Sequence, residues 1–287
     1  MTLRYAAGMD AARHDAPLLV IQRSSAWRGI DFREVWRYRE MLYFLVWRDV
    51  KVRYKQTTLG ITWALIQPLL GMIVLAFVFG RVAKLPSEGI PYPLFAFAGM
   101  LPWTFFSNAV TNGSMSVVTS GNLLTKVYFP RILIPAAAVM TALVDFFIAG
   151  MMLIPLFFYY HFVPSPRLVY GLPLAMAVCV AFALGLSITL SALIVRYRDL
   201  RHAVPFVMQI WMFATPIVYS LSVVPPKYRW AMNVNPMAPL IETFRRSMFG
   251  GAIASSGLLW ALLVAAVLIL GGSIYFRHLE RIFADVI

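Results

Sequence analysis

The feature that most constrains this chain is a set of six long stretches that are almost free of charge. Together these stretches hold one Asp, Glu, Lys or Arg, which is Asp145. A helix needs about 20 apolar residues to cross the hydrocarbon core of a bilayer, and only helices and closed barrels satisfy their backbone polar groups there. The sequence therefore predicts an all-α integral membrane protein with six transmembrane helices. The predicted spans are residues 59–80, 94–118, 132–160, 168–195, 203–221 and 257–276.

Composition supports this prediction. Of the 287 residues, 61% are hydrophobic and only 13% are charged, whereas soluble domains contain about 25% charged residues. The single cysteine, Cys179, lies inside an apolar stretch, which excludes an intramolecular disulfide and a cysteine metal cluster. The first 30 residues lack the apolar block and cleavage site of a signal peptide. We expect residues 1–31 to form a cytosolic tail and residues 57–287 to form the six-span domain.

The positive charges predict the orientation in the membrane. Six crossings place both ends of the chain on one side, and that side carries twelve Lys and Arg residues near the spans against seven on the other. Because cytosolic loops hold the excess of cations, both termini are predicted to be cytosolic. The net charge is +13, and eleven of the 25 Lys and Arg residues fall in residues 1–55, where they are mixed with six acids and followed directly by apolar sequence. This arrangement fits an anionic membrane surface, and we expect no nucleic-acid partner.

Residues 32–56 are predicted to form an amphipathic helix at the membrane surface. Arg53 falls on its apolar side, where Asp49, four residues earlier, is expected to pair with it. One alternative is that this helix is only a membrane anchor. We favour a further role as a surface for a cytosolic partner, because the span that begins at residue 59 already supplies anchoring. The basic arc of the predicted helix contains Arg33, Arg37, Arg48 and Lys51.

The connection between the second and third spans, residues 120–131, suits docking on another protein. Asn122 is placed to cap a helical turn and Pro130 to end it, and the apolar residues between them are of the kind that bind in a groove. The alternative is a tight turn whose apolar residues lie in the membrane. The residues expected to contact a partner are Asn122, Leu123, Leu124, Lys126, Tyr128, Phe129 and Arg131.

The connection between the fifth and sixth spans, residues 222–256, is long and rich in proline. It includes an apolar helical stretch at 240–249 that is too short to cross a bilayer. We interpret this region as a re-entrant pair of short helices in the outer leaflet, which is tolerated where the backbone is buried in protein or lines a wet cavity. An ordinary surface loop is the alternative.

Two features inside the spans suggest packing roles. Asp145 lies halfway along the third span without a Lys, Arg or His in any span. Because a charge at this depth is costly and faces a bundle interior or a cavity, we favour a packing or hydrogen-bonding role over coupling to ions. On the fourth span, Ala177, Ala181, Gly185 and Thr189 form a small-residue stripe, against which another helix can pack closely.

Several enzyme signatures are absent from the sequence. It contains no GxxxxGK[ST] or GxGxxG loop, no GxSxG and no HExxH, which are the marks of nucleotide, dinucleotide, esterase and metalloprotease sites. The four histidines are scattered and lack metal-ligand spacing. If this chain takes part in active transport, the energy must come from another subunit. Aromatic residues crowd the span ends, where they form interfacial belts or stack on sugar faces along a path.

Four blocks of sequence, in order, carry a resemblance to a known family. They are RDVKVRYKQTTLGITWALIQPLL at 48–70, LLTKVYFPRILIP at 123–135, VRYRDLRHAVPFVMQIWMFATPIVY at 195–219 and NPMAPLIETFRRSMFG at 235–250. Over roughly residues 30–287 the chain resembles the permease subunit of ATP-binding-cassette exporters of cell-surface polysaccharides, of O-antigen, teichoic-acid or capsule type.

The resemblance implies a transport subunit rather than an enzyme. Such permeases form homodimers in the bacterial cytoplasmic (inner) membrane and bind two separate subunits that hydrolyse ATP, so ATP and Mg would be bound by the partner and this chain would hold no cofactor. Their substrate is a polysaccharide linked to polyprenyl diphosphate, and membrane lipids surround them. Two alternatives stay open: the permease of a drug or lipid exporter, and an integral membrane transferase that acts on a polyprenyl lipid.

The resemblance also implies roles for particular residues. The segment at 32–56 would be the interface helix and the turn at 122–130 the coupling helix that docks on the ATPase. Candidates for the glycan path are Trp63, Trp103, Phe106, Trp211 and Phe213. The outer gate would lie at about 223–250 and include Pro225, Tyr228, Pro236, Glu242, Arg245 and Arg246.

Overall fold

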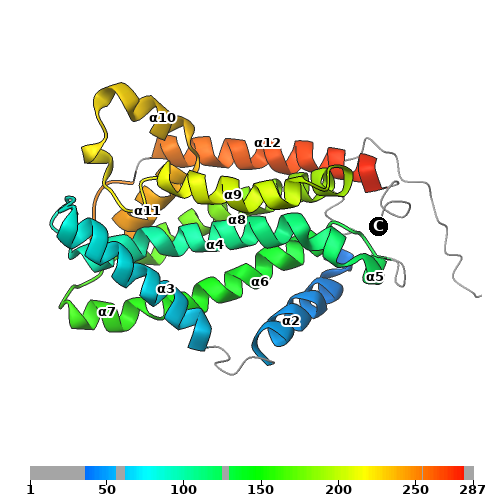
Figure 1. Cartoon of the computed structure of the whole chain (residues 1–287), viewed down its shortest axis with the longest axis horizontal. Coiled ribbons are helices and arrows are strands. Elements are labelled where there is room, and N and C mark those ends of the chain that lie inside the picture. Colours follow the sequence, from blue (N-terminus) through cyan, green and yellow to red (C-terminus); the bar gives the residue numbers. More distant parts are fainter. Residues whose placement is uncertain (1–35, 56–61, 125–128, 254, 281–287) are drawn as a thin grey trace, which may run out of the picture.

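The computed structural model describes residues 36–55, 62–124, 129–253 and 255–280, and within these ranges the regular structure is entirely helical (Figure 1). The prediction of an all-α protein is therefore confirmed. Five helices in the described ranges are long and apolar enough to cross a membrane, and each coincides with one of the predicted spans. These helices are Thr62–Val82, Tyr92–Thr119, Leu133–Tyr159, Leu168–Arg196 and Ser255–Glu280.

The predicted fifth span is the exception in length. The structure places α9 at Leu200–Phe213, a helix of 14 residues. At 1.5 Å per residue it reaches about 21 Å, which is shorter than the roughly 30 Å of the hydrocarbon core. The chain leaves the helix at Phe213 and turns through a segment that contains Thr215 and Pro216. Proline restricts the residue before it to non-helical conformations, which explains why the apolar pattern outlasts the helix.

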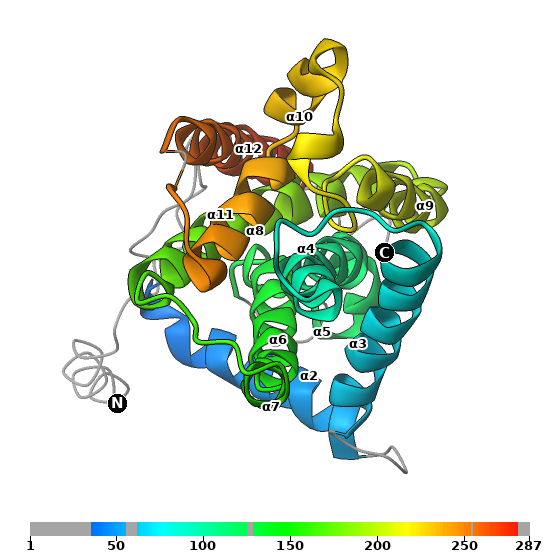
Figure 2. The ribbon, with the colours of Figure 1, turned by 90° about the vertical axis from the view of Figure 1, so that its left-hand side faces the viewer.

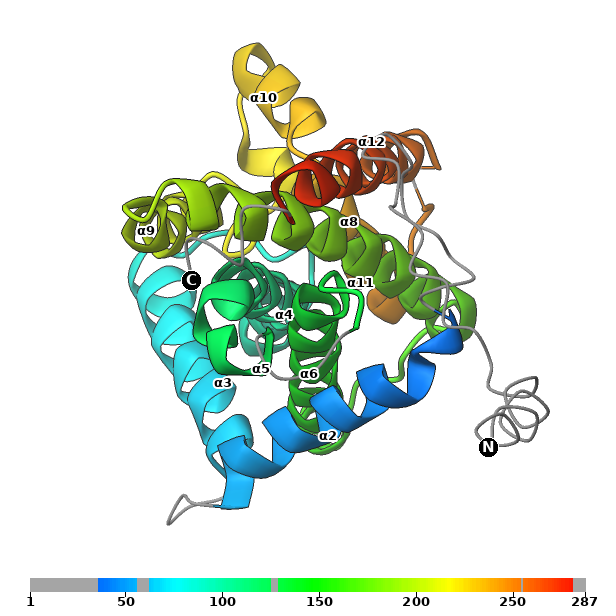
Figure 3. The same cartoon turned by 90° about the vertical axis from the view of Figure 1, so that its right-hand side faces the viewer.

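Helix α4, Tyr92–Thr119, forms the centre of the bundle. Figures 2 and 3 show it surrounded by α3, α6, α8 and α9, and the main core cluster gathers along it. In the most apolar 18-residue stretch of α4, 78% of the residues are buried, whereas in the corresponding stretch of Thr62–Val82 only 6% are buried. Thr62–Val82, made of α3 (Thr62–Leu75) and the π-helical turns of η1 (Ala76–Val82), therefore presents apolar side chains outward.

Small residues hold α8, Leu168–Arg196, against α12, Ser255–Glu280. A Cβ atom on Gly185 of α8 would lie 2.9 Å from the backbone nitrogen of Ile269, and one on Gly272 of α12 would lie 3.3 Å from the carbonyl oxygen of Gly185. Such close backbone approach is possible only without side chains at the contact. The small-residue stripe therefore packs on a helix of the same chain, which the sequence alone left undecided.

Helix α2, Arg39–Lys55, crosses the bundle on the outside of α6, Leu133–Gly150 (Figure 3). Its buried Leu45 packs with Phe129, Leu133 and other residues at the start of α6. Burying such a side chain contributes about 1.5–3 kcal/mol. The contact fixes α2 to the same end of the bundle as the short helix α5, Gly121–Leu124.

The opposite end of the bundle carries the short helices. Helix α7, Leu153–Tyr159, follows α6, while η2 (Leu221–Val223), η3 (Pro226–Tyr228) and α10 (Arg229–Val234) form a projection beside α12 (Figures 1 and 2). Helix α11, Met237–Phe249, then returns to the bundle and packs against α8 and α4. The predicted helical stretch at 240–249 is thus part of a longer helix.

Candidate functional site

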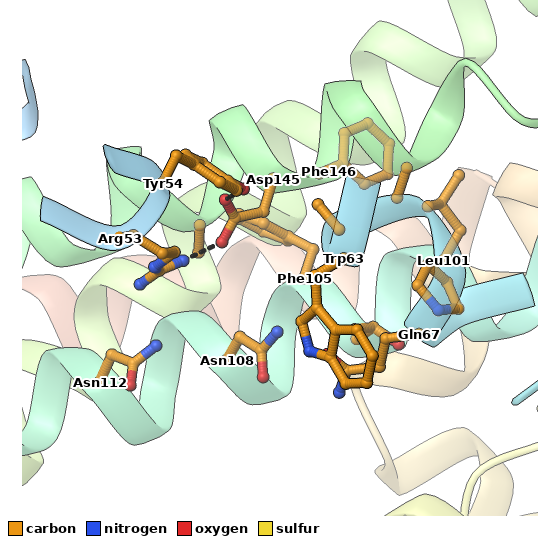
Figure 4. A pocket seen from close by; sticks show the side chains of 15 residues that line it. Arg53, Tyr54, Trp63, Gln67, Leu101, Phe105, Asn108, Asn112, Asp145 and Phe146 are labelled. Carbon is orange, nitrogen blue, oxygen red and sulfur yellow. Dashed lines mark hydrogen bonds and ion pairs between the residues drawn. The ribbon is translucent and has the colours of Figure 1, made fainter. Parts of the chain in front are cut away.

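A cavity of about 520 Å³ opens between α2, α3, α4 and α6 (Figure 4). Each of these helices contributes at least one polar side chain to its wall: Arg53 from α2, Gln67 from α3, Asn108 from α4 and Asp145 from α6. The full lining is Arg53, Tyr54, Trp63, Ala64, Gln67, Pro68, Leu101, Thr104, Phe105, Asn108, Asn112, Ala142, Asp145, Phe146 and Ala149.

An ion pair links two walls of this cavity. A guanidinium nitrogen of Arg53, Nη1, donates to Oδ2 of Asp145, which is the one acidic residue predicted within the spans. The expectation that Arg53 pairs with Asp49 is wrong. No predicted span contains a basic partner for Asp145, and the one it has comes from α2, outside the spans. Asp49 instead accepts from the neighbouring Arg48 at 2.7 Å. The prediction failed because Arg53 belongs to the surface helix and reaches Asp145 only after α2 has packed on α6.

The second partner of the Asp145 carboxylate is Tyr54, whose hydroxyl donates to Oδ1. Burial, together with this hydrogen bond and the negative charge of Asp145, raises the pKa of the Tyr54 phenol well above its ordinary value. Tyr54 therefore remains a neutral donor at physiological pH. One carboxylate thus holds both Arg53 and Tyr54 at the end of α2, as Figure 4 shows.

Polar residues of α4 extend the cavity along the helix. Thr104, Asn108 and Asn112 are four residues apart and therefore share one face. A second cavity of about 610 Å³ shares Arg53 and Asn112 with the first and continues toward Ser120 at the end of α4. The two cavities form a polar cleft beneath α2. Sequence reasoning missed the residues of α4, although polar side chains repeated every fourth residue in an apolar helix were the signal that could have found them.

The five aromatic residues proposed for a glycan path separate into two groups. Trp103 of α4 and Trp211 of α9 pack edge to face with ring centroids 6.1 Å apart, and Phe106 stacks on Phe182 at 5.0 Å. Trp103 and Phe106 are buried in the core of this chain. Aromatic pairs of this kind stabilise a core. Trp63 and Phe213 are half exposed, and of the five only Trp63 lines the cavity in Figure 4.

The residues proposed for the interface helix also have different surroundings. Arg37 and Lys51 are exposed, whereas Arg48 and Arg53 are each partly buried in an ion pair. Arg33 lies outside the described residues. The outward face of α2 also exposes large aromatic side chains beside its cations. These are Tyr43, Phe44 and Trp47, and Trp36 is exposed just before the helix begins. An aromatic and basic face of this composition is typical of a helix at a membrane interface.

The proposed coupling segment is tied to two other parts of the chain. Phe129 is buried in the cluster that contains Leu45 of α2, and Leu123 packs on the same cluster. Arg131 donates from Nη1 to the backbone carbonyl of Glu280, at the end of α12, at 2.6 Å. The side chains of Asn122 and Leu124, and the whole of Lys126 and Tyr128, lie outside the described residues.

At the other end of the bundle, Arg245 of α11 is buried and serves as an internal bridge. Its Nη1 donates to the carbonyl of Pro216 at 2.7 Å and its Nη2 to the carbonyl of Ile217, both in the turn after α9. Its Cζ lies 3.7 Å from the centroid of the Phe95 ring on α4. Arg245 thus connects α11, the end of α9 and α4, and its Nε has no hydrogen-bond partner in the part of the chain that the structure describes.

The other residues proposed for an outer gate lie around this bridge. Arg246 donates to Glu242 at 2.6 Å and to the carbonyl of Ala252 at 2.7 Å. Glu242 and Arg246 line a shallow cavity of about 340 Å³ together with Glu88 and Arg229. The remaining three lie at helix boundaries: Pro225 precedes η3, the exposed Tyr228 ends it, and Pro236 precedes α11.

Among the residues that the structure describes, no three His, Cys, Asp or Glu side chains lie close enough to hold a metal ion. The Asp145 carboxylate is held by Arg53 and Tyr54 at the wall of the cavity. This arrangement can bind a polar group at the depth of the membrane.

Comparison with known proteins shows which family and which proteins this chain is similar to. The family model described as ABC-2 type transporter matches residues 40–249. The chain is similar to the O-antigen export system permease protein RfbA of Myxococcus xanthus, with 32% identity over 259 residues, which cover 89% of this chain and 98% of that protein. A protein of the same name from Klebsiella pneumoniae is 30% identical over 248 residues, covering 86% and 95% of the two chains.

A more distant similarity involves the polysialic acid transport protein KpsM of Escherichia coli. It is 21% identical over 214 residues, which cover 72% of this chain and 80% of that protein. These similarities cover between 72% and 89% of this chain, and the family match at residues 40–249 includes nearly all of α2 together with α10 and α11.

Proposed function

The chain belongs to the ABC-2 type transporter family, and from this premise we propose that it is the transmembrane subunit of an ATP-driven exporter of O-antigen-type polysaccharide. The observation that carries the proposal is its similarity over 89% of its length to an O-antigen export permease. Five apolar helices of membrane-spanning length agree with a permease. The chain acts as a transport subunit in the bacterial inner membrane, and the enzymatic step belongs to an ATP-binding-cassette partner that holds ATP and Mg.

Coupling to this partner is assigned to the segment at 122–131. Phe129 and Leu123 join it to α2, and Arg131 joins it to the end of α12. A partner that pushes on this segment therefore moves two helices that bracket the bundle. The exposed basic residues Arg37, just before α2, and Lys51 of α2 extend the same surface.

A homodimer accounts for the unburied helices. Both the α3–η1 helix and α9 expose rows of large apolar side chains, among them Ile73 on α3, Phe77 on η1, and Phe206 and Ile210 on α9. Figure 2 shows these two helices on adjoining sides of α4. A second copy placed against this face, with two ATPase subunits beneath, would enclose a path between the copies. Trp63 and Phe213, which are already half exposed, are the candidates that face it.

Helix α9 is assigned as a sixth crossing. It is short by itself, but the turn that follows it, through Thr215 and Pro216, is held in the bundle by Arg245. Since irregular backbone is tolerated in a membrane where protein buries it, α9 and this turn together complete the crossing. Helices α10 and α11 then form the re-entrant pair at the outer face, and both termini lie in the cytosol.

The substrate is assigned as a glycan carried on polyprenyl diphosphate. Reconstitution tests the whole proposal: the chain and its ATPase are placed in liposomes that contain lipid-linked O-antigen, and ATP-dependent transfer across the bilayer is measured. We expect transfer only when both subunits and ATP are present. A Gly/Ser linker in place of residues 122–130 should abolish stimulation of the ATPase while the chain stays folded. Lys126→Glu should weaken coupling more than folding. Transfer by the chain without its ATPase would contradict the proposal.

A further inference from the structure

The most buried helix of the bundle carries two exposed amide side chains. Asn108 and Asn112 of α4 are exposed, although 78% of the most apolar window of this helix is buried. They lie on the side of α4 that faces the Arg53–Asp145 pair, and Gln67 of α3 is exposed at the same cavity (Figure 4). Amides at the depth of a membrane are costly unless they have a polar partner.

The side-chain amides of Asn108, Asn112 and Gln67 form no hydrogen bond with any other residue in the described ranges. Each amide has a carbonyl oxygen that accepts and an NH₂ group that donates. The cavity therefore offers donors and acceptors in comparable number. A group with only acceptors, such as a phosphate, uses half of this capacity, whereas a sugar hydroxyl both donates and accepts.

The charges of the cleft point to a neutral ligand. Arg53 is paired with Asp145 in the first cavity, and Arg48 is paired with Asp49 in the second. These four are the Asp, Glu, Lys and Arg residues that line the two cavities. Their charges cancel, so the cleft holds no surplus cation for a diphosphate. An anion would have to displace Asp145 from Arg53 and leave a partly buried carboxylate without its cation, which is unfavourable.

Size and shape also fit a saccharide. The volume of about 520 Å³ falls within the roughly 300–1,000 Å³ of small-molecule sites. Trp63 is half exposed at the wall of the cavity, and an indole face suits the apolar face of a sugar ring. The amide side chains can hydrogen-bond the hydroxyls of a sugar, and the indole ring of Trp63 can stack on its apolar face.

We propose that the cavity between α2, α3, α4 and α6 binds a neutral sugar unit of the transported glycan, with Asn108, Asn112 and Gln67 as hydrogen-bonding residues and Trp63 as the stacking surface. This inference rests on the proposed function. The Arg53–Asp145 pair stays intact and supplies one further donor and acceptor. The second cavity, which continues to the end of α4, gives a polar route to this site from the side of the coupling segment.

Binding to the complete complex of this chain and its ATPase in lipid nanodiscs tests the inference with two probes. One probe is the O-polysaccharide released from its carrier by mild acid, which carries no phosphate at its reducing end. The other is polyprenyl diphosphate without sugar. Asn108→Leu and Asn112→Leu should each weaken binding of the polysaccharide by about tenfold, the equivalent of losing one or two hydrogen bonds, and should leave polyprenyl diphosphate binding unchanged. Ser107→Ala and Thr111→Val on the same helix, outside the cavity, should change neither.

Three results would overturn the inference. The first is unchanged or undetectable binding of the polysaccharide in wild type and variants alike. The second is a selective loss of polyprenyl diphosphate binding, which would assign the cavity to the anionic carrier. The third is a disulfide between two copies of Asn112→Cys, which would show that a second chain fills the cavity. Export of glycan by the wild-type complex is measured in parallel: its absence contradicts the proposed function, whereas normal export by both leucine variants contradicts only the sugar site.

Discussion

Arg53 and Asp145 form an ion pair across 92 residues of sequence, and this pair joins the last turn of α2 to α6. The side chain of Asp145 is 19% exposed and that of Arg53 is 37% exposed, so the pair is partly shielded from water. A helix that lies on the outside of the bundle is thereby fixed to a transmembrane helix at the wall of a cavity. The stability of this contact is open to direct measurement.

Breaking the pair from either side should destabilise the protein. Asp145→Asn and Arg53→Met each leave a partly buried partner unpaired, at an expected cost of about 1–3 kcal/mol in the free energy of unfolding. Chemical unfolding in detergent, followed by tryptophan fluorescence, measures this cost, and the double variant should cost less than the sum of the two. Arg48→Met is the matched control, because the Arg48–Asp49 pair is more exposed and should contribute less than about 1 kcal/mol. If Arg48→Met and Arg53→Met lower the free energy of unfolding equally, the ion pair with Asp145 does not stabilise the fold.

The contact between α8 and α12 should not tolerate a methyl group at Gly185. The added Cβ would lie 2.9 Å from the backbone nitrogen of Ile269, so Gly185→Ala must separate the two helices, at a cost of about 1–3 kcal/mol. Gly271→Ala, where a Cβ meets nothing within 4 Å, should leave the midpoint of thermal unfolding unchanged or slightly higher. If both variants melt alike, close packing at Gly185 is not what holds these helices together.

Arg245 and Arg246 should differ in their importance although they are adjacent. Arg245→Met leaves the carbonyls of Pro216 and Ile217 without their buried donor, which should cost at least about 2 kcal/mol. Arg246→Met removes a partly exposed guanidinium, 37% exposed, whose partner Glu242 is 13% exposed. Because water can reach that side of the pair, this variant should cost less than Arg245→Met, about 1–2 kcal/mol. Limited proteolysis in the segment between α9 and α11 provides a second readout, and it should accelerate for Arg245→Met alone. A larger loss for Arg246→Met would mean that the bridge to the turn after α9 is not what fixes α11.

The orientation of the chain can be read from cysteine labelling. Cys179 is buried, so the native chain should not react with a membrane-impermeant maleimide. Cysteines at the exposed positions Val163 and Val223 should be labelled from the periplasmic side, and one at Tyr197 only from the cytosolic side. This pattern requires both α8 and α9 to cross the membrane. Labelling of positions 197 and 223 from the same side would show that α9 does not cross.

The sequence predicts some residues of the site but not the contacts between them. The residues that carry unusual polarity in apolar surroundings, Asp145 and the amides of α4, are visible in the sequence, but their partners are not. The sequence predicts that Arg53 pairs with Asp49 on a surface helix, and that Trp103 and Phe106 belong to a glycan path or an interfacial belt, whereas the structure buries these two aromatic residues in the core. Which side of a helix faces a cavity depends on how neighbouring helices pack, and the pattern of one helix does not contain that information.

The sequence by itself predicted a helical membrane protein, since uncharged stretches of about 20 residues or more are long enough to cross a bilayer as helices, which satisfy their backbone polar groups within each segment. It also located five helices of spanning length, because their length is dictated by bilayer thickness. The tertiary structure decided the rest: that α9 ends at Phe213, that the stripe on α8 packs on α12, and that Asp145 pairs with Arg53. Each of these depends on contacts between segments far apart in the chain, where close packing and the cost of an unpaired buried polar group select one arrangement among many.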